Sequence, residues 1–139
     1  MAIKRFKVEK LIRDYLPDIM RNKGILVHER VMEQEEFIAK LKDKLQEEAA
    51  EVKHAKNVNE LTEELADMLE VIHSLSKATG IPLERLEKAR YAKKQEKGGF
   101  DRKIYNSYVD VEETNPSIEY FLKKGEHYPL MESLLTQEI

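Results

Sequence analysis

Two long segments in the middle of the chain carry apolar residues at helical spacing. Residues 35–56 form the first, and the second runs from Asn59 to Gly80. The apolar positions are Leu41, Leu45, Ala49, Val52 and Ala55 in the first segment and Leu61, Leu65, Met68, Leu69, Ile72 and Leu75 in the second. This period predicts two amphipathic helices, joined by a turn near Val58-Asn59 that makes them antiparallel. Asn59 is the expected N-cap of the second helix.

Proline and glycine residues predict three shorter helices in the rest of the chain. Proline favours the first turn of a helix, and glycine favours the position after its last turn. On these signals we expect helices from Pro17 to just before Gly24, from Pro82 to about Lys97, and from Asn115-Pro116 to Lys124.

Two further segments, residues 25–32 and 103–111, are rich in apolar or alternating residues and are expected to pair as a small ribbon. The apolar tail, residues 127–139, is expected to dock on the body of the protein or on a second subunit. The predicted fold class is therefore mainly α, a helical bundle with a minor β-ribbon in a single domain, 1–139. Three helices bury only part of such wide apolar arcs, so we expect a homodimer or homotetramer.

The acidic residues of the two long helices form the most informative pattern. Glu48 and Glu51 are three residues apart, as are Glu64 and Asp67, so each pair shares a helix face. In an antiparallel hairpin, residues whose numbers give the same total lie at the same height. The residue numbers of Glu48 and Asp67 have the same sum as those of Glu51 and Glu64. The four carboxylates are therefore expected to lie at the same height along the hairpin.

These acids also stand in unusual positions relative to the apolar arcs. Glu48 and Glu64 fall within the arcs, whereas Glu47 and Glu63 point away from them. Carboxylates that face a core together repel one another unless a cation neutralises them, and Mg²⁺ or Mn²⁺ prefers such an all-oxygen site. Charged residues make up 37% of the chain. A half-solvated acidic face on a non-catalytic helical interaction module is therefore the alternative.

Composition narrows the classes of function. The chain has 139 residues, no cysteine and a formal net charge of −3. The lack of cysteine excludes disulfides and thiolate chemistry, and the negative charge gives no basic field for binding nucleic acid. No apolar run in the sequence approaches membrane-spanning length. We therefore expect a cytoplasmic protein with neither nucleic acid nor membrane as a partner.

Three motifs, in the same order along the chain, resemble one family. EExxE, twelve residues and ExxD, over residues 47–67, is similar to the metal motif of the MazG-like all-α nucleoside triphosphate pyrophosphohydrolases. KLIRDYLPDIMRNKG at 10–24 and KKQEKGGFDRKIY at 93–105 resemble its predicted house-cleaning branch, which removes non-canonical nucleotides. Together the motifs span a core of residues 10–105 and leave residues 112–139 as a C-terminal extension.

The resemblance implies Mg²⁺-dependent hydrolysis of a nucleoside triphosphate between its α and β phosphates, which gives a monophosphate and pyrophosphate. The implied metal ligands are Glu48, Glu51, Glu64 and Asp67. The implied catalytic residues are Glu47 and Glu48, with Glu47 orienting the attacking water or binding a second ion. The implied substrate-binding residues are Lys93, Lys97 and Arg102 at the phosphates, and Lys10, Arg13 and Asp14 on the N-terminal side.

A second reading within the same superfamily is phosphoribosyl-ATP pyrophosphohydrolase, an enzyme of histidine biosynthesis. Residues 10–14 argue against it, because they resemble the house-cleaning branch. Two positions depart from the pattern of that branch. Lys97 stands where arginine is expected, which weakens a bidentate grip on phosphate, and Tyr15 stands where lysine is usual. No sequence pattern identifies residues that would bind the edge of a nucleobase, so the sequence does not predict the base of the substrate.

Overall fold

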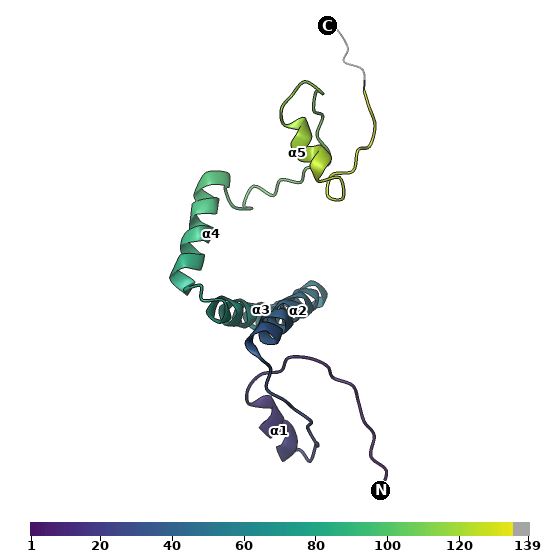
Figure 1. Ribbon diagram of the computed structural model, residues 1–139, viewed down its shortest axis with the longest axis vertical. Coiled ribbons are helices and arrows are strands. Elements are labelled where there is room, and N and C mark those ends of the chain that lie inside the picture. Colours follow the sequence, from purple (N-terminus) through teal and green to yellow (C-terminus); the bar gives the residue numbers. More distant parts are fainter. Residues whose placement is uncertain (135–139) are drawn as a thin grey trace. The chain divides into compact units, whose positions relative to one another are not determined.

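The structure is a computed structural model that describes residues 1–134, and within them it contains five helices and no strand (Figure 1). The helices are α1 Leu16–Asn22, α2 Gln34–His54, α3 Val58–Ala78, α4 Leu83–Lys97 and α5 Ile118–Lys123. Each expected helix is found within a few residues of its expected limits, so the mainly α fold class is confirmed. None of these helices is long and apolar enough to cross a membrane.

The chain divides by its internal contacts into two compact units. The first unit, Met1–Gly98, contains α1 to α4, and the second begins at Gly99 and contains α5. This boundary falls inside residues 10–105, which the three sequence motifs span. The assignment of a single domain to residues 1–139 therefore stays a prediction.

The centre of the first unit is a hairpin in which α2 packs against α3 (Figure 1). At its open end, the side-chain amide of Gln34 donates a hydrogen bond of 2.8 Å to the carbonyl oxygen of Ala78, so the start of α2 lies beside the end of α3. Leu41 on α2 and Val71 on α3 are buried. Apolar burial fixes the height of one helix relative to the other, and this height decides which of their carboxylates can meet.

The turn between the two long helices corrects one expectation. Asn57, and not Asn59, is the N-cap of α3: its side-chain oxygen accepts a hydrogen bond of 2.8 Å from the backbone N–H of Glu60. The Glu60 carboxylate in turn accepts a bond of 2.9 Å from the backbone N–H of Lys56. Of the two asparagines, only Asn57 has a glutamate three residues later, and the bonds that both side chains make at the start of α3 favour it as the cap.

The other end of α3 is closed by Gly80, which has a φ of 74°. Its N–H donates to the carbonyl of Lys77, and the next N–H, that of Ile81, donates to the carbonyl of Ser76 at 2.8 Å. This is the Schellman arrangement, in which a residue in the left-handed region lets two otherwise free carbonyls find partners. The chain then turns into α4, which packs against α3 and has no buried residue.

The expected β-ribbon is wrong. Neither residues 25–32 nor residues 103–111 form a strand. Most of their apolar side chains are exposed to solvent, with Val31 fully exposed and Tyr105 90% exposed. An isolated two-stranded ribbon is marginal in water unless one face packs on a core, and these segments offer no such face.

In the second unit, α5 carries a small aromatic cluster. The ring of Phe121 lies 5.2 Å from that of Tyr120 and 5.2 Å from that of Tyr128, both edge to face, so the start of the apolar tail packs on α5. Leu130, Met131 and Leu134 are exposed. The rest of the tail, from Leu135 to Ile139, lies outside the described residues, and its docking on the body or on a second subunit stays a prediction.

The cap assignment predicts a difference between two asparagines that lie two positions apart. Asn57→Ala removes the acceptor for the N–H of Glu60, and we expect the free energy of unfolding to fall by about 1 kcal/mol. Asn59→Ala, inside the first turn, is expected to change it by less than about 0.5 kcal/mol. Urea unfolding followed by circular dichroism, at one protein concentration for all variants, measures both. Equal losses would contradict the assignment.

Candidate metal centre

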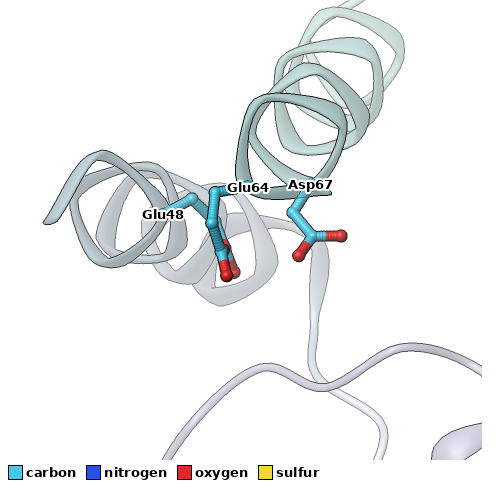
Figure 2. Close-up of side chains that lie close together, drawn as sticks. All are labelled: Glu48, Glu64 and Asp67. Atoms are coloured by element: carbon cyan, nitrogen blue, oxygen red, sulfur yellow. The ribbon is translucent and has the colours of Figure 1, made fainter. Parts of the chain in front are cut away.

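Three carboxylates from the two long helices come together in the first unit. Glu48 from α2 and Glu64 and Asp67 from α3 each offer an oxygen, and these three oxygens all lie within 4.8 Å of one another. Figure 2 shows the three side chains extending to the same side of the hairpin, with the carboxylates of Glu48 and Glu64 close together. Hard divalent ions bind carboxylate oxygens, so this donor set fits Mg²⁺ or Mn²⁺.

The burial of Glu48 sets it apart from an ordinary surface acid. The residue is 8% exposed, and an ionised carboxylate at such a position requires a partner. Its partner in the structure is Lys44, one turn earlier on α2, whose Nζ lies 3.6 Å from the carboxylate. Sequence reasoning missed Lys44, although a lysine four residues before a core-facing glutamate is a readable signal.

The pKa of the Glu64 carboxyl reflects the closeness of these acids. Partial burial raises its pKa above the ordinary value, and the negative charges of Glu51, Asp67, Glu48 and Glu63 raise it further. Burial and the neighbouring charges both disfavour the ionised form of Glu64. A divalent cation at the cluster would offset the repulsion from the neighbouring charges. The carboxylates of the centre therefore repel one another, and a bound cation would reduce this repulsion.

Glu51 is not part of the close group. Four carboxylates were expected at one level, but only three offer oxygens within 4.8 Å of one another, and Glu51 is exposed on α2. It remains near enough for its charge to raise the pKa of Glu64. Its role as a ligand stays a prediction.

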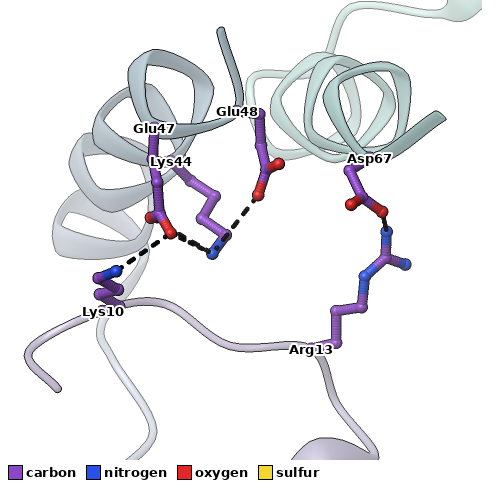
Figure 3. Close-up of polar contacts among 6 residues, drawn as sticks. All are labelled: Lys10, Arg13, Lys44, Glu47, Glu48 and Asp67. Carbon is purple, nitrogen blue, oxygen red and sulfur yellow. Dashed lines mark hydrogen bonds and ion pairs between the residues drawn. The ribbon is translucent and has the colours of Figure 1, made fainter. Parts of the chain in front are cut away.

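The N-terminal segment reaches the acids from a distant part of the sequence. Arg13 donates a hydrogen bond of 2.7 Å to Asp67, and the Nζ of Lys10 lies 3.3 Å from a carboxylate oxygen of Glu47, which Lys44 also contacts (Figure 3). The structure thus places Lys10 and Arg13 beside acids of the two long helices. Their contact with a substrate, and the catalytic role of Glu47, stay predictions.

Within the first unit, the remaining predicted substrate residues, Asp14, Lys93 and Lys97, make no ion pair with the acids of the cluster. Asp14 helps to line a groove of about 630 Å³ beside the C-terminal half of α3, with Glu70, His73 and Lys77 among the other lining residues. Lys93 and Lys97 are exposed on α4, and Arg102 belongs to the second unit. Within residues 1–134 these last three cations make no ion pair, so their roles stay predictions as well.

Comparison with protein families gives a match over the hairpin. The family model described as phosphoribosyl-ATP pyrophosphohydrolase matches residues 23–93, just over half of the chain. The match includes α2, α3 and the acids that these two helices carry, and it leaves out Lys10, Arg13 and Asp14. Comparison with curated proteins and with solved structures gives no match.

The raised pKa of Glu64 predicts how stability depends on pH without a divalent ion. Between the ordinary value of 4.5 and the raised value, the folded state binds more protons than the unfolded state, so stability falls as the pH rises through this window. Glu64→Gln removes this fall. We expect the metal-free variant to be at least as stable as wild type at pH 7 and to lose that advantage below pH 4.5.

Urea unfolding from pH 4 to pH 8 in the presence of a chelator measures this dependence, at approximate half-unit intervals. Glu63→Gln is the matched control, since Glu63 is exposed and lies outside the close group. It removes only the last of the four neighbouring charges that raise the pKa of Glu64, so it is expected to keep most of the wild-type dependence. A Glu64→Gln variant that is less stable than wild type at every pH would contradict the interpretation.

Proposed function

The chain belongs to the phosphoribosyl-ATP pyrophosphohydrolase family, and from that premise we propose that it hydrolyses a nucleoside triphosphate between the α and β phosphates with the help of Mg²⁺. The family is part of the MazG-like all-α pyrophosphatase superfamily, so the chain is a hydrolase of phosphoric anhydrides that acts on a nucleotide. The observation that carries the proposal is the approach of the Glu48, Glu64 and Asp67 carboxylates within 4.8 Å.

The proposed metal ligands are these three carboxylates, with Glu51 joining them by a change of side-chain conformation. Both long helices are rigid supports, so the ligands are held in place before an ion arrives. When bound, Mg²⁺ supplies positive charge that stabilises the phosphate oxygens and the leaving pyrophosphate. No shifted pKa is required of the ligands, because all of them bind as carboxylates.

The chain's own residues supply the remaining parts of the reaction. A water molecule attacks the α phosphorus, the bond from that phosphorus to the bridging oxygen breaks, and pyrophosphate leaves with the bonding electrons. We assign the orientation of this water, and acceptance of its proton, to Glu47, which Lys10 and Lys44 hold at 3.3 Å. Lys10, Arg13 and Lys44 add positive charge on the side from which a polyphosphate would approach.

For the substrate we propose a non-canonical nucleoside triphosphate, which makes the protein a house-cleaning enzyme of the cytoplasm. The support is the resemblance of residues 10–24 and 93–105 to that branch, together with the contacts that Lys10 and Arg13 make with the acids. Phosphoribosyl-ATP is the second candidate, because the matching family carries its name. A panel of canonical, oxidised and deaminated triphosphates together with phosphoribosyl-ATP, assayed for pyrophosphate release, separates the two.

We also propose a homodimer or homotetramer. Leu61, Leu65 and Leu69 recur along one side of α3, and in the single chain they are 36%, 49% and 52% exposed. Burying these side chains against a second copy would remove a row of leucines from water and complete the half-covered hairpin.

This proposal predicts a dimer or tetramer at micromolar concentration, measured by light scattering after size-exclusion chromatography. Leu65→Lys places a charge in the row of leucines, and we expect it to shift the protein toward monomer and to lower its melting temperature. A wild-type protein that is monomeric and well folded at the same concentration would overturn the proposal.

Two neighbouring glutamates provide the sharpest test of the metal mechanism. Glu64→Gln removes one ligand charge from the cluster. We expect pyrophosphate release to fall by about 100-fold or more, since even the loss of an outer partner of a metal ligand costs about 10- to 100-fold. Glu63→Gln, one residue away and outside the cluster, is expected to stay within about twofold of wild type.

The measurement is single-substrate kinetics on the triphosphate that the wild type hydrolyses fastest. Circular dichroism confirms that each variant is folded. Wild-type turnover in both variants would mean that the acids are an ordinary solvated face, and the metal mechanism would be abandoned.

A further inference from the structure

The acid cluster already has positive charges of its own, and they come from two places. Lys44 is part of α2 and stays beside Glu48 whatever the rest of the chain does. Lys10 and Arg13, by contrast, belong to the segment before α1 that passes alongside the carboxylates (Figure 3). Six acidic residues lie at or beside the centre: Glu47, Glu48, Glu51, Glu63, Glu64 and Asp67. Three cations therefore leave it with excess negative charge, enough to attract a divalent ion.

The contact of Arg13 differs from the others in what it occupies. Its guanidinium lies 2.7 Å from Oδ1 of Asp67, one of the three residues whose oxygens form the close group. Lys10 contacts Glu47, which is outside that group. The Arg13 side chain is 63% exposed, and exposed ion pairs are weak, so this contact can be broken at little cost.

We propose that Arg13 is an exchangeable counter-ion of the metal centre. It pairs with Asp67 when no divalent ion is bound, releases Asp67 when the ion binds, and then contacts the phosphate chain of the substrate. The first half concerns the protein and the ion alone, and the second half rests on the proposed hydrolysis of a nucleoside triphosphate.

Charge and geometry support the exchange. A divalent cation bound to Asp67 would lie within a few ångströms of the guanidinium, and two positive groups at that distance repel each other. Arginine also presents two parallel N–H donors that match a phosphate as well as they match a carboxylate. A triphosphate approaching the loaded centre therefore offers the displaced side chain a partner of the same geometry.

The alternative is that Arg13 stays in place and orients Asp67 toward the ion, as outer partners of metal ligands often do. The two arrangements predict opposite signs for one measurement. If Arg13 competes with the ion, its removal tightens the binding of the ion. If Arg13 orients the ligand, its removal weakens that binding.

The experiment is isothermal titration calorimetry with Mg²⁺ and no nucleotide, on the full chain. Arg13→Gln is expected to bind Mg²⁺ about two- to fivefold more tightly than wild type, the range that the loss of one weak competing ion pair allows. Arg5→Gln is the matched control. It removes the same charge from the same segment, and within residues 1–134 Arg5 has no ion pair.

A second readout tests the contact with substrate. On the triphosphate that the wild type hydrolyses, Arg13→Gln is expected to raise KM by about tenfold or more while kcat changes by less than about threefold, because a charge-assisted contact to the substrate is lost. Arg13→Lys keeps the charge without the paired donors, and its KM is expected to fall between those of wild type and Arg13→Gln.

The outcomes separate this inference from the proposed function. If the wild type binds no Mg²⁺, the proposed metal mechanism fails and the exchange fails with it. If the wild type binds Mg²⁺ but Arg13→Gln binds it no more tightly than Arg5→Gln does, only the exchange is overturned. Circular dichroism on each variant shows whether the fold is intact, and the exposure of Arg13 predicts that it is.

Discussion

The centre of this molecule depends on the repulsion among carboxylates that the packing of α2 on α3 forces together. Burial of Leu41 and Val71 sets the height of the helices, and at that height Glu48 meets Glu64 and Asp67. Partial burial raises the pKa of Glu64, and this repulsion raises it further. Lys44 and Arg13 offset part of this repulsion through ion pairs with Glu48 and Asp67. The centre keeps a negative charge that favours binding of a cation.

The helices and their pairing could be predicted because local signals agree with one another. Apolar spacing, proline and glycine marked all five helices, and the antiparallel register correctly brought Glu48 to Asp67. The prediction of Asn59 as the N-cap was wrong for a definable reason. Two asparagines lie two residues apart, and only the position of Glu60, three residues after Asn57, distinguishes them. The prediction of a β-ribbon was wrong because a pattern of apolar residues does not show whether a core is available for the ribbon to pack against.

The details of the centre could not be read from helical periodicity. Whether Glu51 joins the close group depends on a side-chain conformation that balances repulsion against solvation, and a helical wheel contains no such term. The contact of Arg13 with Asp67 joins residues 54 positions apart, and only the family resemblance, through its N-terminal motif, pointed to that segment. The contact of Lys44 with Glu48, by contrast, follows a spacing of four residues that the sequence shows directly.

The most direct measurement of the central claim is thermal unfolding with and without saturating Mg²⁺. An ion that binds only the folded protein raises the melting temperature by mass action. The account predicts a clear rise for wild type and for Glu63→Gln, and none for Glu64→Gln or Asp67→Asn. An unchanged wild-type midpoint, or an equal rise in all four proteins, would contradict it.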